Sequence, residues 1–194
     1  MDRETARTRV LDAAETLFYA RGAHSVGMDE IRDSSGVSLK LLYQLFGGKD
    51  QLVEEFLKRR DVRWRARLAE HVALQDSAED RILSVFDWLY EWFTQPTFRG
   101  CAWINLNGEL GAVSPTVCRQ AQAHKLAFVE YLRGLVLAAE LPEALTGHLS
   151  LLAEGAMVTA GIFGRADPAL EAREAAGLLI RAARVGALSG ATAP

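Results

Sequence analysis

The sequence predicts an all-α protein of about nine helices, in which three short helices form an N-terminal helix-turn-helix module and a larger helical domain follows. Two observations carry this prediction. Apolar residues recur at the three- and four-residue spacing of amphipathic helices, and no stretch between turn signals alternates as a β-strand would. Glycine, proline and capping residues then divide the helical pattern into separate segments.

The first helix is expected over residues 4–21, where Val10, Leu17 and Phe18 lie on one face. Gly22 supplies the left-handed residue that commonly ends a helix. This segment is therefore predicted to be an amphipathic helix with a defined C-terminal end.

Two shorter helices are expected next, from Met28 to about Ser34 and from Ser38 to Phe46. Gly36 suits the tight turn between them, and the Ser38 hydroxyl is placed to cap the third helix. The spacing is that of a helix-turn-helix.

Six further helices are expected in the remainder of the chain. Pro96 and Gly100 mark a loop, whereas Ser114 and Asp167 each precede a proline, which is typical of a cap and a first turn. The fifth helix is apolar on almost every face and should be surrounded by others. The expected ranges are 49 to about 74, 79–93, 103–110, 115 to about 140, 142–163 and 168–188, and the tail 190–194 is expected to fray.

The charge balance requires any nucleic-acid site to be local. The formal net charge is -3, and the first sixty residues hold ten basic and ten acidic side chains. A segment of suitable character exists, because residues 34–49 contain no acidic residue but include Lys40, Tyr43 and Gln44. Such a helix approaches a phosphate backbone without charge repulsion.

The compartment predicted is the cytoplasm, with no membrane association. The charged N-terminus is unlike a signal peptide, and no apolar run is long enough to span a bilayer. Cys101 and Cys118 are too few for a zinc ribbon or a disulfide scaffold, which fits a reducing compartment. A redox role for this pair remains an alternative.

Residues 10–52, VLDAAETLFYARGAHSVGMDEIRDSSGVSLKLLYQLFGGKDQL, resemble the N-terminal pattern of the TetR family of transcriptional regulators in order and spacing. The resemblance covers about a quarter of the chain. It implies a DNA-binding domain over residues 1–48 and a helical ligand-binding and dimerisation domain over residues 49–194. Val26 departs from the pattern where a capping hydroxyl is usual, so Ser25 or Gly27 must cap the second helix.

The resemblance also implies roles for the third helix and the residues beside it. Tyr43 and Lys49 would contact the phosphate backbone, and Lys40 and Gln44 are candidates for base edges. A solvated Lys40 and a core Tyr43 are the alternatives, and Arg3 and Arg7 would either bind DNA or be solvated. The predicted DNA-binding residues are Ser38, Leu39, Lys40, Leu41, Tyr43, Gln44 and Lys49.

Aromatic side chains in the larger half predict a site for a bulky, largely apolar effector, because such sites combine many apolar groups with few polar ones. The alternative is that these rings only fill the core. The last two expected helices are rich in small residues, which favours a homodimer interface over packing within one chain. The predicted pocket residues are Trp64, Phe86, Trp88, Trp92, Trp103, Asn105 and Phe128.

The function expected is that of a ligand-responsive repressor, released from a palindromic, double-stranded DNA operator by a small effector. No catalytic residue, metal site or cofactor is expected, because the sequence lacks a P-loop, a nucleophile elbow and paired histidines at metal-binding spacing. A catalytic site assembled only in space stays open. A second alternative is a helical ligand-binding or scaffold protein with weakened DNA binding, because Leu39 and Leu41 are unusual in a reading helix.

Overall fold

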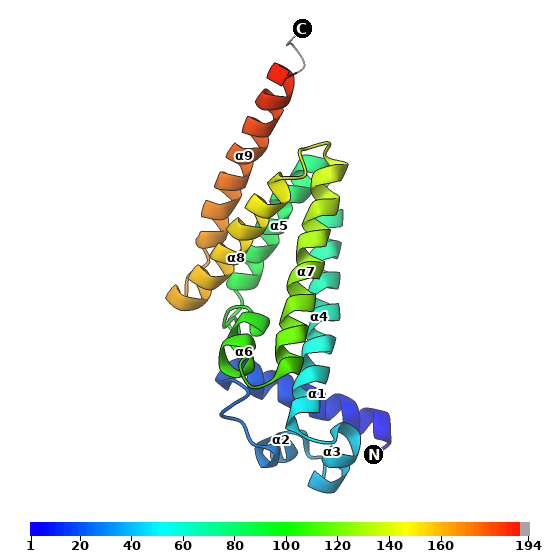
Figure 1. The fold of residues 1–194 in the computed structure, drawn as a ribbon. Helices are drawn as coiled ribbons and strands as arrows, with labels where there is room; N and C mark the ends of the chain where they lie inside the picture. Colours follow the sequence, from blue (N-terminus) through cyan, green and yellow to red (C-terminus); the bar gives the residue numbers. More distant parts are fainter. Residues whose placement is uncertain (191–194) are drawn as a thin grey trace. The chain divides into compact units, whose positions relative to one another are not determined.

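The structure, a computed structural model, describes residues 1–190 and the side chains of residues 1–185. Within these residues it contains nine α-helices and no strand, which confirms the predicted fold class. The helices are α1 Arg3–Arg21, α2 Met28–Ser35, α3 Leu39–Phe46, α4 Lys49–Ala73, α5 Ala78–Phe93, α6 Ala102–Leu110, α7 Pro115–Ala138, α8 Leu145–Phe163 and α9 Pro168–Gly190 (Figure 1). Of the predicted tail 190–194, Gly190 is the last residue of α9, and residues 191–194 lie outside the described residues.

The largest difference from the predicted boundaries is the start of α8, which lies at Leu145 and not at Pro142. The Leu145 N–H donates to the Pro142 carbonyl at 2.9 Å, and the Thr146 N–H donates to Glu143 at 3.0 Å. These three-residue bonds form a tighter turn before the α-helical ladder begins. Proline therefore marks the turn that precedes the helix.

The chain forms two compact units. The first unit contains residues 1–63 and 101–124, and the second contains residues 64–100 and 125–190. Helices α4 and α7 each contribute residues to both. The predicted division between residues 48 and 49 is a functional one, which packing does not test, and it stays a prediction.

The core of the first unit forms where α2 and α3 pack against α1. Phe18 of α1 is buried and meets the Phe56 ring of α4 edge to face, with centroids 5.9 Å apart. Leu42 and Phe46 are the buried side chains of α3. Burial of an apolar face on each helix thus stabilises the packing of these three helices.

The turn residues predicted for the helix-turn-helix adopt the required conformations. Gly36 has a φ of 66° in the left-handed region, and its N–H donates to the Arg32 carbonyl at 2.9 Å. The Ser38 hydroxyl accepts the Leu41 N–H at 3.3 Å. The C-terminal end of α2 and the N-terminal end of α3 are therefore both capped.

The start of α2 is capped at Gly27 and not at Ser25. The Glu30 carboxylate accepts the Gly27 N–H at 3.1 Å. The Arg21 guanidinium and this N–H lower the pKa of Glu30 below its ordinary value. Val26 is fully buried, so the position that lacks a capping hydroxyl contributes to the core.

The second unit is built around α5, which packs against α8 and α9, and these two helices also pack against each other (Figure 1). Eight side chains of α5 are buried, among them Val85, Leu89 and Phe93. This agrees with the prediction that the fifth helix is surrounded by others. Arg184 of α9 donates to Glu79 of α5 at 2.8 Å.

Three further features concern the described part of the chain. No helix there is long and apolar enough to cross a membrane. No group of three or more His, Cys, Asp and Glu side chains there is arranged to hold a metal ion. Cys101 is buried and Cys118 is half-buried, and neither forms a disulfide.

Two glycine-to-alanine substitutions should change stability in opposite directions. Gly36→Ala places a Cβ in the left-handed region without a steric clash and should lower the free energy of unfolding by about 1–2 kcal/mol. Gly134→Ala, in the exposed middle of α7 where a Cβ meets nothing within 4 Å, should raise it by about 0.5–1 kcal/mol. Urea denaturation measures both. Equal effects of the two substitutions would contradict the prediction that a side chain at residue 36 strains the turn.

Candidate nucleic-acid interface

One side of α3 is polar and exposed. Lys40, Tyr43 and Gln44 are exposed, and Tyr43 retains 45% of its accessible surface although it is aromatic. Leu42 and Phe46 lie on the buried side, as the helical period requires. The core-aromatic alternative for Tyr43 is thus not favoured, since its ring lies on the exposed side.

The first turn of α3 is less polar. Ser38 is exposed, and its hydroxyl accepts the Leu41 N–H. Leu39 and Leu41 are half-buried, so part of each side chain remains on the surface. The first turn therefore presents apolar surface next to Lys40.

The two N-terminal arginines bind within the protein. Arg3 donates from Nη2 to the Gln44 carbonyl at 3.0 Å, which ties the start of α1 to the end of α3. Arg7 pairs with Glu55, and its guanidinium lies 4.9 Å from the centre of the Phe46 ring. Both guanidiniums contact residues of α3, and neither is simply solvated.

A cluster of charges holds α1 against the first part of α4. The Glu15 carboxylate accepts from Arg59 at 2.9 Å, from Arg60 at 2.9 Å and from Arg63 at 3.2 Å. The Arg60 guanidinium also lies 3.9 Å from the centre of the Tyr19 ring. Several partly buried partners on one carboxylate make this network more rigid than an isolated surface pair.

Lys49 begins α4 and is half-buried. Its Nζ donates to the backbone carbonyl of His24, in the loop between α1 and α2, at 3.3 Å. Lys49, for which a phosphate contact is predicted, is therefore bound to a carbonyl of its own chain. An ammonium has three donors, so this bond leaves two for another partner.

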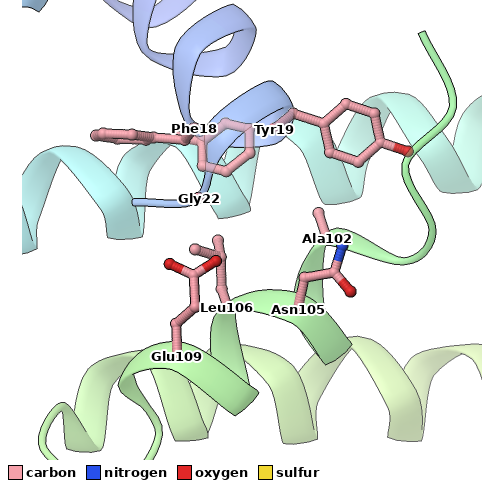
Figure 2. Close-up of a pocket in the computed structure, with 8 residues that line it drawn as sticks. Phe18, Tyr19, Gly22, Ala102, Asn105, Leu106 and Glu109 are labelled. Carbon is pink, nitrogen blue, oxygen red and sulfur yellow. The ribbon is translucent and has the colours of Figure 1, made fainter. Parts of the chain in front are cut away.

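A small cavity lies between α1, α4 and α6 of the first unit (Figure 2). Its volume is about 30 Å³, which is room for roughly one water molecule. Glu109 lies at its edge, and Oε2 of this carboxylate accepts the His24 N–H at 3.1 Å. Sequence reasoning did not identify this bond, because 85 residues separate its partners and no local pattern links them.

Five of the seven predicted pocket residues are buried side chains of the second unit, Phe86 among them. The Trp64 ring meets Trp88 edge to face at 4.9 Å and Phe128 at 5.5 Å. The Trp88 and Trp92 rings are 5.6 Å apart. The structure thus brings Trp64, Trp88, Trp92 and Phe128 together as one aromatic cluster. The role of the five residues in ligand binding stays a prediction.

The other two predicted pocket residues lie on α6 in the first unit. Trp103 is buried and stacks on the His124 ring with centroids 3.5 Å apart, and His124 Nδ1 lies 2.6 Å from Asp61 Oδ1. Asn105 is exposed and lines the small cavity. The predicted set is therefore divided between the two units.

A protein-family model described as bacterial regulatory proteins, tetR family, matches residues 10–56, which contain the whole helix-turn-helix. The transcriptional activator FasR of Mycolicibacterium smegmatis is 44% identical over 59 residues, which is 30% of this chain and 27% of FasR. The transcriptional repressor KstR2 of Rhodococcus jostii is 38% identical over 52 residues, 27% of this chain and 26% of KstR2. These matches span only about a quarter of each relative's length.

Solved structures match almost the whole chain. A TetR-family transcriptional regulator from Streptomyces coelicolor superimposes with a TM-score of 0.84 at 28% identity, covering 92% of this chain and 90% of that one. A putative TetR transcriptional regulator from Streptomyces avermitilis gives a TM-score of 0.79 at 29% identity, covering 92% and 98%. The similarity therefore extends from the helix-turn-helix through the helices that follow it.

Proposed function

Because this chain belongs to the TetR family of bacterial regulatory proteins, we propose that it is a cytoplasmic, DNA-binding repressor that a small, largely apolar effector releases from a palindromic operator. One observation carries the DNA-binding part of the proposal. The exposed side of α3 presents Lys40, Tyr43 and Gln44, and the helix contains no acidic residue. The named relatives include one activator and one repressor, so repression rather than activation is part of the proposal.

The polar side of α3 suits the major groove. Lysine donates to the acceptors of guanine, and glutamine pairs with adenine through two hydrogen bonds. The Tyr43 hydroxyl donates to a phosphate, and the exposed parts of Leu39 and Leu41 suit a thymine methyl. Base readout by Lys40 and Gln44 and backbone contact by Tyr43, Lys49 and Ser38 together define the proposed interface.

A second copy of the chain is the proposed partner of α8 and α9. Exposed apolar side chains on α8 include Leu151, Val158 and Ile162, which follow one helical stripe, and Phe163 beside them. Leu170 and Leu178 are exposed on α9. Monomeric proteins rarely leave such a surface uncovered, and a two-fold pairing of both helices would bury it in a four-helix interface.

A two-fold dimer fixes the form of the operator. Its two α3 helices would enter successive major grooves about 34–36 Å apart, so the half-sites repeat once per helical turn. The aromatic cluster is the proposed effector site. Trp64 of this cluster and Lys49 lie on the same continuous helix, so a tilt of α4 on effector binding would change the spacing.

Substitutions at Lys40 and Tyr43 should have different effects on DNA binding. Lys40→Ala removes a base contact and should cost about 1–3 kcal/mol at the preferred operator while it relaxes the preference at one base pair. Tyr43→Phe removes a phosphate contact and should weaken binding to all sequences by a similar factor. Gel-shift titrations with an operator library measure both.

Two outcomes would change the interpretation of that experiment. Equal losses on all sequences from Lys40→Ala would reassign this residue to the phosphate backbone. If the wild-type protein bound neither the library nor the promoter region beside its own gene, the alternative of a helical ligand-binding or scaffold protein would be favoured.

The dimer surface is tested by one substitution at two places. Val158→Asp puts a charge on the exposed stripe of α8 and should convert the dimer to a monomer, because an unpaired charge at a buried interface costs several kcal/mol (about 3–5). Val62→Asp, at an exposed position of α4, is the matched control and should leave the dimer intact. Analytical ultracentrifugation measures the mass. If the Val158→Asp protein remained a dimer, this side of α8 would not be the dimer interface.

The effector site is tested by reciprocity. Small apolar aromatic compounds are screened for quenching of tryptophan fluorescence, and those that bind should weaken operator binding about 5- to 150-fold, a coupling of about 1–3 kcal/mol. Operator DNA should weaken binding of the same compound by the same factor. A compound that binds equally well with and without the operator would show that the two sites are not coupled.

A further inference from the structure

We propose that Glu109 of α6 is a positioning residue for DNA binding, which acts through the backbone of His24 on Lys49. The inference rests on the proposed function, because that function assigns Lys49 to a phosphate. All three residues belong to the first unit. Two hydrogen bonds connect them, and a third observation places the Glu109 carboxylate directly beside Gly22, at the end of α1.

The first bond joins α6 to the loop between α1 and α2. Glu109 Oε2 accepts the His24 N–H at 3.1 Å. Figure 2 shows the carboxylate pointing from α6 toward Gly22, at the end of α1. A carboxylate that accepts a backbone N–H makes a stronger bond than a neutral acceptor does.

The second bond continues from the same loop residue to α4. The His24 carbonyl accepts from Lys49 Nζ at 3.3 Å. The backbone of His24 is thus bonded to both helices: its N–H donates to Glu109 of α6, and its carbonyl accepts from Lys49 of α4. Movement of α6 relative to this loop would change the position of the Lys49 ammonium.

Gly22 makes the approach of Glu109 possible. A Cβ at this position would lie 2.5 Å from Glu109 Oε1 and 2.8 Å from the other carboxylate oxygen. With a Cβ at residue 22, the Glu109 carboxylate would have to move away from its present position. Gly22 also has a φ of 81°, in the region that side chains disfavour.

The loop between α1 and α2 also has contacts that do not involve Glu109. Ala23 and Val26 are fully buried, and the Ser25 hydroxyl donates to the Arg21 carbonyl at 2.7 Å. Removal of the Glu109 carboxylate should therefore leave the module folded and affect mainly the position of His24. A folded variant with weaker DNA binding would therefore distinguish positioning of His24 from a general role of Glu109 in stability.

Pre-organisation of Lys49 decides whether loss of Glu109 raises or lowers the affinity for DNA. A lysine side chain loses rotamer freedom when it is fixed on a phosphate, and the bond to His24 imposes part of that loss beforehand. Without Glu109, the His24 carbonyl would be less well placed, and DNA would have to order Lys49 itself. DNA affinity should therefore fall when the acceptor at residue 109 is lost.

Simple electrostatics predicts the opposite result. Glu109 is negative, so its neutralisation alone would strengthen binding to a polyanion. Glu109→Gln keeps an acceptor oxygen and removes the charge, whereas Glu109→Ala removes both. Positioning predicts that Glu109→Gln retains wild-type affinity within about twofold and that Glu109→Ala loses about 3- to 10-fold. Electrostatics predicts tighter binding for both variants.

A double-mutant cycle with Lys49→Met tests whether Glu109 affects DNA binding through Lys49. If Glu109 acts through Lys49, Glu109→Ala should have no further effect on operator affinity in the Lys49→Met protein. A role elsewhere in the fold would give additive losses. Thermal unfolding of each variant serves as the control for stability.

A measurement without DNA keeps the inference separate from the proposed function. Glu109→Ala should accelerate amide hydrogen exchange at His24 and shift the side-chain ammonium signal of Lys49 in nitrogen-resolved NMR spectra, and Glu109→Gln should largely restore both. If Glu109→Ala leaves both signals unchanged, or if the cycle is additive, the positioning role is wrong. If the signals change as expected but wild-type protein binds no operator, the proposed function fails while the link between Glu109 and Lys49 stands.

Discussion

Burial of Leu42 and Phe46 is the constraint on which the proposed interface depends. Because α3 has only eight residues, fixing two of them in the core fixes the rotation of the whole helix about its axis. Lys40, Tyr43 and Gln44 are then exposed together on the other side. The left-handed turn at Gly36 sets where this helix begins, so apolar burial and one turn residue together decide which groups are available to DNA.

Most of the fold could be predicted because its signals are local. Apolar periodicity and the residues at helix ends act within a few positions of each other, so Gly36 and Ser38 could be given their turn and capping roles from the sequence. The predicted start of α8 is three residues too early, because a proline can be followed either by a tight turn or directly by a helix. Local signals thus identify an element better than they place its first residue.

The site could be predicted only in part, for the same physical reason. The residues of α3 lie close together in sequence, and the helical period places them on one face. The contact of Glu109 with His24, by contrast, depends on how α6 packs, and the sequence contains no pattern that joins them. The aromatic character of Trp103 and Trp64 predicts one site for both, but they belong to different units. Chemical similarity does not determine which side chains pack together.

Pairing of charges limits how much nonspecific attraction this module exerts on DNA. Arg7 pairs with Glu55, and the cluster of arginines on α4 pairs with Glu15. Within the described residues, Lys40 has no carboxylate partner, so it presents its full charge on the exposed side of α3. Paired cations release few counterions on DNA binding, because their charge is already compensated. Discrimination between operator and other DNA would therefore depend on a few contacts from α3 and Lys49, and the position of each matters more than the total charge.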